Sequence, residues 1–329
     1  MKVLVTGATG FIGRRLCQSL AERGIEVRAV YRGQPGGASP GTEWWHIPRF
    51  DEVEAMTGAM RGVECAVHLA GLAHQIGSAG EGRWEEFFHT NVTLTRVLAQ
   101  SCKRAGVQRL VFLSSIAATR GAENSPVTTA MSPAPESDYG RSKLQAEIAL
   151  EEELRNSPVD WCILRPPVIY GPGNPGNMER LLRLVSKGLP LPIGAIRNRR
   201  SFMYIENLVD AILRVTEYRG QIRATWMIGD DTQLSTPELV RALAIAAGLR
   251  PRIFRMPLRV LRTLGRLADV AGRATGRSLP LDTYTVSKLT ESLAVDSSEF
   301  RRQFAWQPPV PVEAALRMTS EQILSRGSS

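Results

Sequence analysis

Tyr139 and Lys143 are the residues of this sequence whose types and spacing best suit proton transfer. They stand four positions apart in YGRSK, so on a helix they share one face. A free tyrosine has a pKa of about 10, and a neighbouring ammonium group favours the phenolate and lowers that pKa. The pair could therefore move a proton to or from a substrate oxygen while a cofactor moves a hydride. Taken alone, a pair at this spacing is more often an exposed helix face.

Two serines could complete such a site. Ser114 and Ser115 follow Arg109–Leu113 (RLVFL), an apolar run that is typical of a buried strand. A hydroxyl at the end of this strand would hold the oxygen that Tyr139 protonates. Together with the glycine-rich turn described next, the serines favour the catalytic interpretation of Tyr139 and Lys143 over the exposed helix face.

The first thirteen residues, MKVLVTGATGFIG, predict where a cofactor would bind. Val3–Val5 is typical of a strand buried on both faces, and a helical pattern begins at Arg14. Between them, Gly7, Gly10 and Gly13 let the backbone approach a pyrophosphate, whose charge the helix dipole and free N–H groups favour. The alternative is a tight turn that binds nothing. We favour the nucleotide site because three glycines remove packing side chains without an evident structural gain.

The end of the next predicted strand, Glu26–Tyr31, bears on the choice between NAD and NADP. In a nucleotide unit of this kind, an acid there binds the ribose 2′-hydroxyl and an arginine meets a 2′-phosphate. The strand ends in Tyr31 and Arg32, and the nearest acid, Glu26, stands at its other end. We therefore expect NADP, with NAD as the alternative. An exposed surface arginine is the competing explanation of Arg32.

Strands and helices alternate through the first ~165 residues, which predicts an α/β, Rossmann-type doubly wound parallel sheet. The later strands are predicted at 43–47, 65–69, 109–113, 160–164 and 224–228. Helices are predicted at 14–23, 87–105, 142–154, 178–187, 207–218 and 236–247, the last with Thr236 as its N-cap. Residues 1–170 would form the dinucleotide-binding domain, to which 200–230 return. Residues 171–199 and 231–329 would form a smaller, mostly C-terminal α+β substrate lobe.

Two polar residues lie inside predicted core elements. His68 stands in an apolar strand and is best explained as a hydrogen-bonded core histidine. Asn91 stands within the predicted helix 87–105, where it either bonds locally or braces the active site from behind.

Composition points to an ordinary globular protein of 329 residues, with 43% apolar and 22% charged residues. No run approaches the ~20 apolar residues of a membrane span, and no signal peptide is recognisable, so we expect a cytoplasmic protein. The four cysteines are isolated and predict reduced core thiols and no metal site. The formal net charge of +9 favours phosphate-bearing small molecules over nucleic acid, because the basic residues lack an interleaved aromatic platform.

The segment Leu258–Ala274 combines an apolar stripe with interspersed arginines. A basic amphipathic helix of this kind can lie on an anionic membrane. An ordinary surface helix has the same pattern, so membrane contact is the less favoured of the two interpretations.

The motifs, taken in order, resemble those of the extended short-chain dehydrogenase/reductases of the NAD-dependent epimerase/dehydratase type. The resemblance covers nearly the whole chain, and its later motifs are similar to those of the branch that acts on nucleotide sugars. The segments that carry it are GATGFIG (7–13), HLAG (68–71), SS (114–115), YGRSK (139–143), RPPVIYGPG (165–173) and RRSFMYIENLVDA (199–211). Within that branch the chain looks most like bacterial enzymes of polysaccharide synthesis, namely UDP-4-keto-6-deoxy-N-acetylhexosamine 4-reductases and UDP-sugar 4-epimerases.

This resemblance implies roles for individual residues. Tyr139 would be the general acid/base, Lys143 would contact the nicotinamide ribose and tune Tyr139, and Ser114 or Ser115 would supply the third hydroxyl. Substrate would meet Ser115, Tyr139, Asn177 and Arg200, with Arg200 on the diphosphate and Asn177 near the uridine. The implied cofactor contacts are Gly7, Thr9, Gly10, Phe11, Ile12, Arg32, Leu69, Ala70, Gly71, Ser114, Tyr139, Lys143, Pro166 and Val168.

The chain departs from the family pattern at three places. Ile116 stands where the family usually has the active-site Ser or Thr, so either Ser114 or Ser115 substitutes or the substrate is oriented differently. The sugar-binding Asn of many 4-epimerases is replaced near Val168. Ala117 and Ala118 stand where dehydratases carry acids, which argues against dehydration because removing water needs an extra acid and base.

Three hypotheses follow. The first is reduction of a UDP-4-keto-6-deoxy-N-acetylhexosamine by NADPH, with Tyr139 as the acid. The second is a UDP-sugar 4-epimerase with retained NAD, and the third is a non-catalytic nucleotide-binding scaffold. Arg32 favours the first, because a reductase draws on an exchangeable reduced pool. The resemblance also implies a homodimer through helices near Phe87–Ala105 and Ser142–Leu154.

Overall fold

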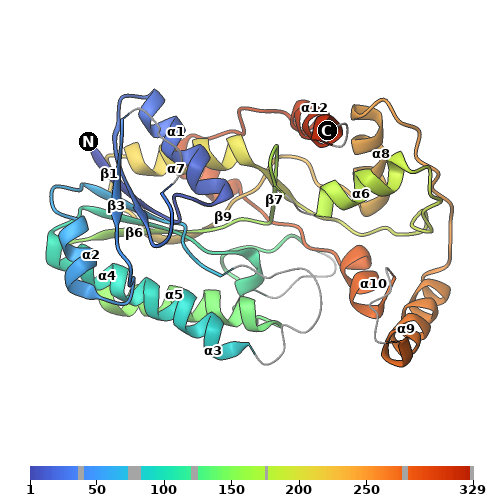
Figure 1. Ribbon diagram of the computed structural model, residues 1–329, viewed down its shortest axis with the longest axis horizontal. Coiled ribbons are helices and arrows are strands. Elements are labelled where there is room, and N and C mark those ends of the chain that lie inside the picture. Colours follow the sequence, from blue (N-terminus) through green and yellow to red (C-terminus); the bar gives the residue numbers. More distant parts are fainter. Residues whose placement is uncertain (36–40, 73–82, 120–124, 175–176, 276–280, 327–329) are drawn as a thin grey trace.

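A parallel sheet lies at the centre of the molecule (Figure 1). In the computed structural model its seven strands, within the described part of the chain, have the order β3-β2-β1-β4-β5-β6-β9. They are β1 (Lys2–Thr6), β2 (Glu26–Tyr31), β3 (Thr42–His46), β4 (Cys65–His68), β5 (Arg109–Leu113), β6 (Asp160–Arg165) and β9 (Arg223–Met227). The structure describes residues 1–35, 41–72, 83–119, 125–174, 177–275 and 281–326.

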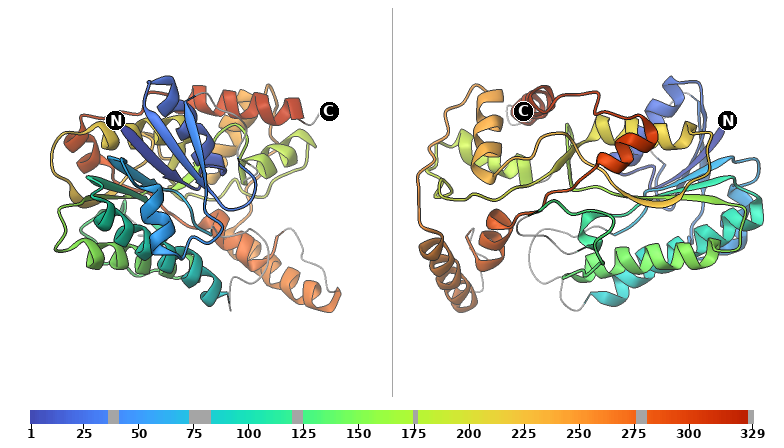
Figure 2. Two further views of the ribbon diagram at one scale, coloured as in Figure 1. Left: turned by 60° about the vertical axis from the view of Figure 1, so that its left-hand side comes forward. Right: turned by 180° about the vertical axis from the view of Figure 1, so that it is seen from behind.

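Helices cover both faces of the sheet, as a doubly wound fold requires (Figures 1 and 2). On one face, α1 (Phe11–Glu22) and α7 (Ile205–Glu217) share a core with Val3, Val5 and Val67. The other face is covered by α2 (Val53–Ala59), α4 (Leu94–Ala105) and α5 (Asp138–Leu154). The alternate residue of β1, Leu4, points into this second core. The predicted fold class is confirmed.

The stretch predicted as one helix over 87–105 has three parts. It begins with α3 (Trp84–Phe87), passes through a π-helical turn, η1 (Phe88–Thr93), and continues as α4. A π-turn adds a residue to the helical repeat, and such turns are frequent at functional sites. Asn91 lies in this turn and is buried.

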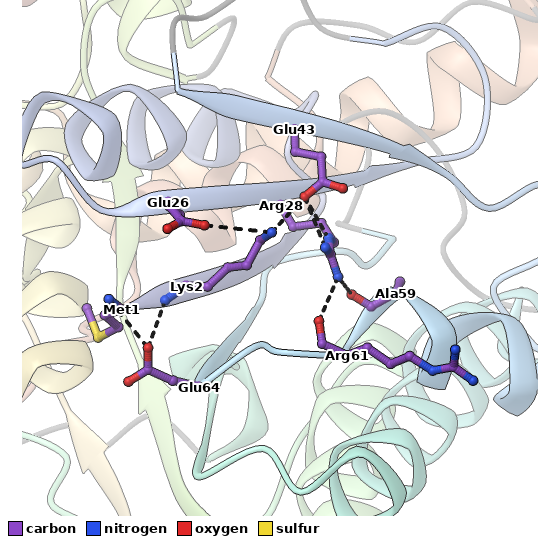
Figure 3. A network of polar contacts seen from close by, with 8 residues as sticks. All are labelled: Met1, Lys2, Glu26, Arg28, Glu43, Ala59, Arg61 and Glu64. Carbon is purple, nitrogen blue, oxygen red and sulfur yellow. Dashed lines mark hydrogen bonds and ion pairs between the residues drawn. The ribbon is translucent and has the colours of Figure 1, made fainter.

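A network of charges joins the strands at the end of the sheet opposite to the glycine turn (Figure 3). The Lys2 ammonium lies 2.9 Å from the Glu43 carboxylate and 3.8 Å from that of Glu26. Arg28 bonds Glu43 and donates to the carbonyl of Ala59 at 2.6 Å. Glu26 therefore belongs to the amino ends of the strands, away from any cofactor at the carboxyl ends.

The remaining elements form a second lobe beside the sheet (Figure 1). A small parallel pair, β7 (Val168–Tyr170) and β8 (Phe202–Tyr204), lies between the two parts. The lobe holds α6 (Asn177–Ser186), α8 (Thr236–Ala246), α9 (Leu258–Thr275), α10 (Thr283–Thr290) and α12 (Val312–Arg326). One segment leaves it: α11 (Ser298–Phe304) packs beside β9, and Phe300 joins the sheet core. Among the described helices, none is long and apolar enough to cross a membrane.

The predicted starts of two helices, α8 and α1, differ from those in the structure. Ser235, not Thr236, is the N-cap of α8, because its hydroxyl accepts from the Glu238 N–H while the Glu238 side chain accepts from the Ser235 N–H. The first helix begins at Phe11 rather than Arg14, so the last residues of the glycine motif are helical. All four cysteines are buried and unbonded, as predicted.

Candidate functional site

The glycine turn lies where the strand order reverses. Strand β1 has β2 on one side and β4 on the other, and ligands of such sheets bind outside the carboxyl ends at this point. The two strand ends are tied together here, since the Ala70 N–H donates to the Thr6 hydroxyl at 3.3 Å. The predicted cofactor residues of the first and fourth strands thus share one edge of the sheet.

The three glycines have different reasons to be glycine. Gly7 has a φ of +69°, and a Cβ there would lie 2.7 Å from the Ala70 nitrogen. A Cβ on Gly13 would lie 2.1 Å from the Gly7 carbonyl oxygen, so Gly13 lets α1 pack on the turn. A Cβ on Gly10 would meet only the Gly7 oxygen, at 3.2 Å. Our premise that the glycines bring no structural gain is therefore wrong for Gly7 and Gly13, and Gly10 is the glycine that leaves backbone open to a ligand.

The amino end of α1 fits an anion. Its N-cap, Gly10, offers no side-chain oxygen to the helix, and the first turn holds no acidic residue. The first N–H groups of a helix have no partner within it, and the helix dipole favours negative charge at that end. The backbone of Gly10, Phe11 and Ile12 can therefore hold a pyrophosphate, which fits the dinucleotide that the turn predicts.

Tyr139 lies in the first turn of α5, facing the end of β5. The helix starts at Asp138, with the Ser137 hydroxyl accepting from the Gly140 N–H at 3.1 Å. Tyr139 is partly buried, which raises the pKa of its phenol, and a hydrogen bond with the Ser115 hydroxyl acts in the opposite direction. The net shift is upward and Lys143 is not among its causes, so the expected lowering of this pKa by the neighbouring ammonium group is not found in the free protein. The structure thus brings together Tyr139 and Ser115, two of the four predicted catalytic residues.

Lys143 lies one turn further along the same face. Its ammonium group donates to the Leu113 carbonyl at 2.8 Å and stands 4.5 Å from the centre of the Phe112 ring. The side chain is buried, and desolvation lowers the pKa of Lys143 to about 8, although the Glu147 carboxylate acts to raise it. A buried cation at the carboxyl end of β5 is suited to favour negative charge on a nearby oxygen.

Ser114 points to the opposite side of its strand from Ser115. Its hydroxyl donates to the Glu147 carboxylate, which also pairs with the Arg165 guanidinium. All three side chains are buried. The Ser114 hydroxyl is thus committed to a structural cluster beneath the site, and Ser115 is the serine that meets Tyr139.

Asn91 braces the site from behind, the second of the two roles that we considered for it. Its amide accepts from the Leu72 N–H at 2.7 Å and donates to the Ser142 hydroxyl at 2.9 Å. Gly71 leaves room for this contact, because a Cβ there would lie 2.9 Å from the Asn91 oxygen. The π-turn thus links the end of β4 to the helix that carries Tyr139 and Lys143.

His68 is a core histidine, as predicted. Its ring bonds Thr6 at 2.7 Å and Thr95 at 3.1 Å, and burial lowers its pKa to about 3. A neutral imidazole with both nitrogens bonded takes no part in proton transfer.

The remaining predicted cofactor contacts surround the same edge. The Thr9 carbonyl accepts from the Arg14 guanidinium at 2.7 Å, and the Leu69 N–H donates to the Thr6 carbonyl at 3.3 Å. The Pro166 carbonyl accepts from the Ile116 N–H at 2.9 Å, and β7 begins two residues later at Val168. Arg32 is exposed, with its guanidinium 5.6 Å from the centre of the Phe50 ring.

Two of the four predicted substrate residues, Arg200 and Asn177, lie away from the Tyr139–Ser115 pair. Arg200 is held by backbone pairing with Leu234, and its guanidinium donates to the Lys288 carbonyl at 3.0 Å. Burial lowers its pKa. Asn177 is the first residue of α6, and its side chain lies outside the described part of the structure.

Ile116 does not line the site in place of the expected hydroxyl. Its side chain packs in a buried cluster with Val127, Met227 and Val295. The hydroxyl that lies at the phenol belongs to the preceding residue, Ser115.

The buried ion pair beneath the site, Glu147 with Arg165, was not predicted from the sequence. The signal that could have found Glu147 is its place in YGRSKLQAE, four residues after Lys143 on the same helix face. Arg165 ends an apolar strand, where an unpaired arginine would be costly.

Comparisons with known proteins agree with this geometry. Residues 3–229 match the sequence profile of the NAD dependent epimerase/dehydratase family. A UDP-glucose 4-epimerase of Vibrio cholerae is 30% identical over 98% of this chain and 95% of its own. The N-acetyl-alpha-D-glucosaminyl-diphospho-ditrans,octacis-undecaprenol 4-epimerase of Escherichia coli O157:H7 is 25% identical, over 90% of this chain and 88% of its own.

The fold has solved counterparts as well. The structure of MoeE5 in complex with UDP-glucuronic acid and NAD superposes with a TM-score of 0.77. It covers all of both chains at 24% sequence identity, so this likeness concerns the fold.

Proposed function

The chain belongs to the NAD-dependent epimerase/dehydratase family, and we propose that it is a UDP-sugar 4-epimerase that exchanges a hydride between carbon 4 and NAD. This revises our first hypothesis, a 4-reductase. The revision rests on the Vibrio cholerae relative, which matches nearly the whole chain and is named for 4-epimerisation. The intact Tyr139 and Lys143 argue against a non-catalytic scaffold.

One observation carries the proposal: the Tyr139–Ser115 pair and the Lys143 ammonium group both lie at the carboxyl end of β5, on the same edge of the sheet as the glycine turn and two strands from it. Proton transfer needs the phenol and its partners within hydrogen-bond reach of one substrate oxygen. Ser115 bonds the phenol, and Lys143 holds its ammonium group against the Leu113 carbonyl.

We assign the following tasks to these residues. When bound, NAD would supply the hydride acceptor and donor for carbon 4, and inversion requires the hydride to return to the opposite face of the sugar. Tyr139, as the phenolate, would take the proton of the 4-hydroxyl and later give it back to the same oxygen. Ser115 would orient that oxygen. The positive charge of the buried Lys143 ammonium would have to offset the burial that raises the pKa of the phenol. Backbone N–H groups at Gly10–Ile12 would hold the pyrophosphate, and we propose that Arg200 and Asn177 hold the UDP moiety.

A 4-ketoreductase is the second candidate, and one residue favours it. Arg32 directly follows β2, where an arginine would meet a 2′-phosphate. The NADP expectation rests on Arg32 alone, whereas the related MoeE5 structure contains NAD. We therefore propose NAD as the cofactor. Whether Arg32 also allows NADP to bind is a question that the assay with both cofactors can test.

Purified protein incubated with UDP-glucose or UDP-N-acetylglucosamine, without added reductant, would separate the two functions. An epimerase interconverts the 4-epimers, which proton NMR detects, with no net change in absorbance at the NADH band. A reductase leaves these sugars unchanged and oxidises NADH or NADPH in step with a UDP-4-keto-6-deoxy sugar. Tyr139→Phe should abolish either activity while retaining NAD. Normal turnover of this variant would refute the role assigned to Tyr139, whereas wild-type protein that binds NAD but shows neither activity would restore the scaffold hypothesis.

We also propose that two copies associate through α4 and α5. These helices pack against each other, and Ile148 of α5 is exposed. Light scattering at micromolar concentration should give the mass of a dimer, and Ile148→Glu should give that of a monomer. A monomeric wild type would contradict this assembly.

A further inference from the structure

Helix α9 lies at the edge of the second lobe, farthest from the central sheet, and extends beyond the neighbouring helices (Figures 1 and 2). Its contacts with the lobe are confined to one side. Leu261 is fully buried, and Gly265 lets α10 approach so closely that a Cβ would lie 3.3 Å from the Thr283 backbone. The opposite side of α9 is open to solvent.

The open side carries large apolar side chains. Val260, Leu264, Leu267 and Val270 are between 40% and 64% exposed, and we call these four the α9 ridge. Exposed large apolar residues concentrate in this region of the described chain, with seven between Ile245 and Tyr284 and five elsewhere. Single exposed apolar residues need no explanation, but a continuous ridge on one helix marks an interaction surface.

The charge around the ridge is almost entirely positive. Residues 248–275 hold seven arginines and one aspartate. This segment therefore has a formal charge of +6, compared with +9 for the whole chain. The aspartate, Asp269, is engaged by the Thr283 N–H at 3.2 Å. The partner of this surface must therefore be anionic as well as apolar.

The helical arrangement places the two kinds of side chain next to each other. Successive residues of an α-helix are about 100° apart. On that basis Arg259, Arg266 and Val270 point away from buried Leu261, and Leu267 lies beside them. Arginine binds phosphate in a planar, bidentate way, and helices with this pattern lie in the headgroup layer with the apolar side inserted.

We propose that α9 docks the protein on the surface of an anionic phospholipid bilayer, with the α9 ridge inserted among the lipids and its arginines on their phosphates. The proposal does not depend on the reaction at Tyr139. A protein partner would be expected to match the ridge with acidic residues, whereas an anionic bilayer supplies both the phosphates and the apolar layer.

Flotation with phospholipid vesicles tests the proposal directly. Wild-type protein should float with phosphatidylcholine vesicles that contain phosphatidylglycerol, and far less with phosphatidylcholine alone. Leu267→Ser/Val270→Ser should lower the partition coefficient at least tenfold. Arg266→Gln should lower it by roughly fivefold, since one basic residue near an anionic surface contributes about 1 kcal/mol.

Matched controls lie outside α9. Leu189→Ser removes an exposed leucine and Arg104→Gln an exposed arginine, and both should float as wild type does. The proposal is overturned if wild-type protein floats with neither kind of vesicle, or equally well with both. It is also overturned if the control variants lose as much vesicle binding as the α9 variants do. It is also overturned if Leu267→Ser/Val270→Ser changes a dimer into a monomer by light scattering while vesicle binding persists. That result would assign the ridge to a second copy of the chain.

Discussion

Replacing Lys143 with methionine should stabilise the fold while removing activity. The ammonium group is buried among Leu113, Phe112 and the backbone, and this desolvation lowers the pKa of Lys143 from 10.5 to about 8. The unfolded chain therefore binds the proton more tightly than the folded protein does. Keeping Lys143 charged at pH 7 works against folding, and methionine has no charge to desolvate.

The size of the effect follows from the shift in pKa. Each unit corresponds to about 1.4 kcal/mol, so the charged lysine costs the folded state about 3 kcal/mol at neutral pH. Methionine loses the hydrogen bond to the Leu113 carbonyl, which contributes about 1 kcal/mol. The net gain is about 2 kcal/mol. For a chain of this length the average unfolding entropy per residue converts that into a Tm higher by about 3 °C.

The direction of the pKa shift also determines how the effect depends on pH. The free-energy cost of burying the charged Lys143 is complete below pH 8 and decreases between pH 8 and 10.5. It vanishes above pH 10.5, where the lysine is neutral in both the folded and the unfolded state. Calorimetry of wild type and Lys143→Met at pH 7 and at pH 10.5 measures this difference in stability. Lys103→Met, at an exposed position, is the control. The variant's kcat should fall by about 10²–10⁴. A lower Tm for Lys143→Met at pH 7, or a gain that persists at pH 10.5, would refute the desolvation argument.

Three further predictions concern the parts around Lys143. Glu147→Gln should lower the free energy of unfolding by about 3–5 kcal/mol in calorimetry, because Arg165 is then buried without a carboxylate. Gly13→Ala should weaken NAD binding at least tenfold in titration calorimetry, since the new methyl would lie 2.1 Å from the Gly7 oxygen, whereas Gly58→Ala meets nothing within 4 Å and should bind normally. His68, whose pKa burial lowers to about 3, should show no titration by NMR between pH 5 and 8, and a change of its ring signals near pH 6.5 would contradict the bonded, neutral ring.

The sheet could be predicted from the sequence because its strands carry their own signal. Val3–Val5 and Arg109–Leu113 are short apolar runs bounded by turn residues, and a strand buried on both faces needs nothing more to be recognised. The pairing of Tyr139 with Lys143 was equally accessible, since a separation of four on a helix fixes a shared face. These inferences depend only on local periodicity.

The parts that could not be predicted depend on contacts between distant segments. The π-turn at Phe88–Thr93 leaves no trace in the apolar pattern, yet it turns Asn91 toward Leu72 and Ser142. The division of labour between Ser114 and Ser115 is likewise set by Glu147, which is 33 positions away. Neighbouring residues of a strand face opposite sides, so one serine had to face the core, but only the packed structure shows which one.

Gly140 shows how such contacts reach the chemistry. It is the second residue of YGRSK, and a Cβ there would lie 2.1 Å from the Ala117 carbonyl oxygen. The first turn of α5 can therefore press against η2 (Ile116–Ala118), the short 3₁₀ turn that the Ser115 hydroxyl caps. The same close contact bears on the distance from Tyr139 to Ser115, because Tyr139 adjoins Gly140 and the Ser115 hydroxyl accepts from the Ala117 N–H. Any larger residue at position 140 would push the first turn of α5 away from η2, and the phenol away from the Ser115 hydroxyl with it.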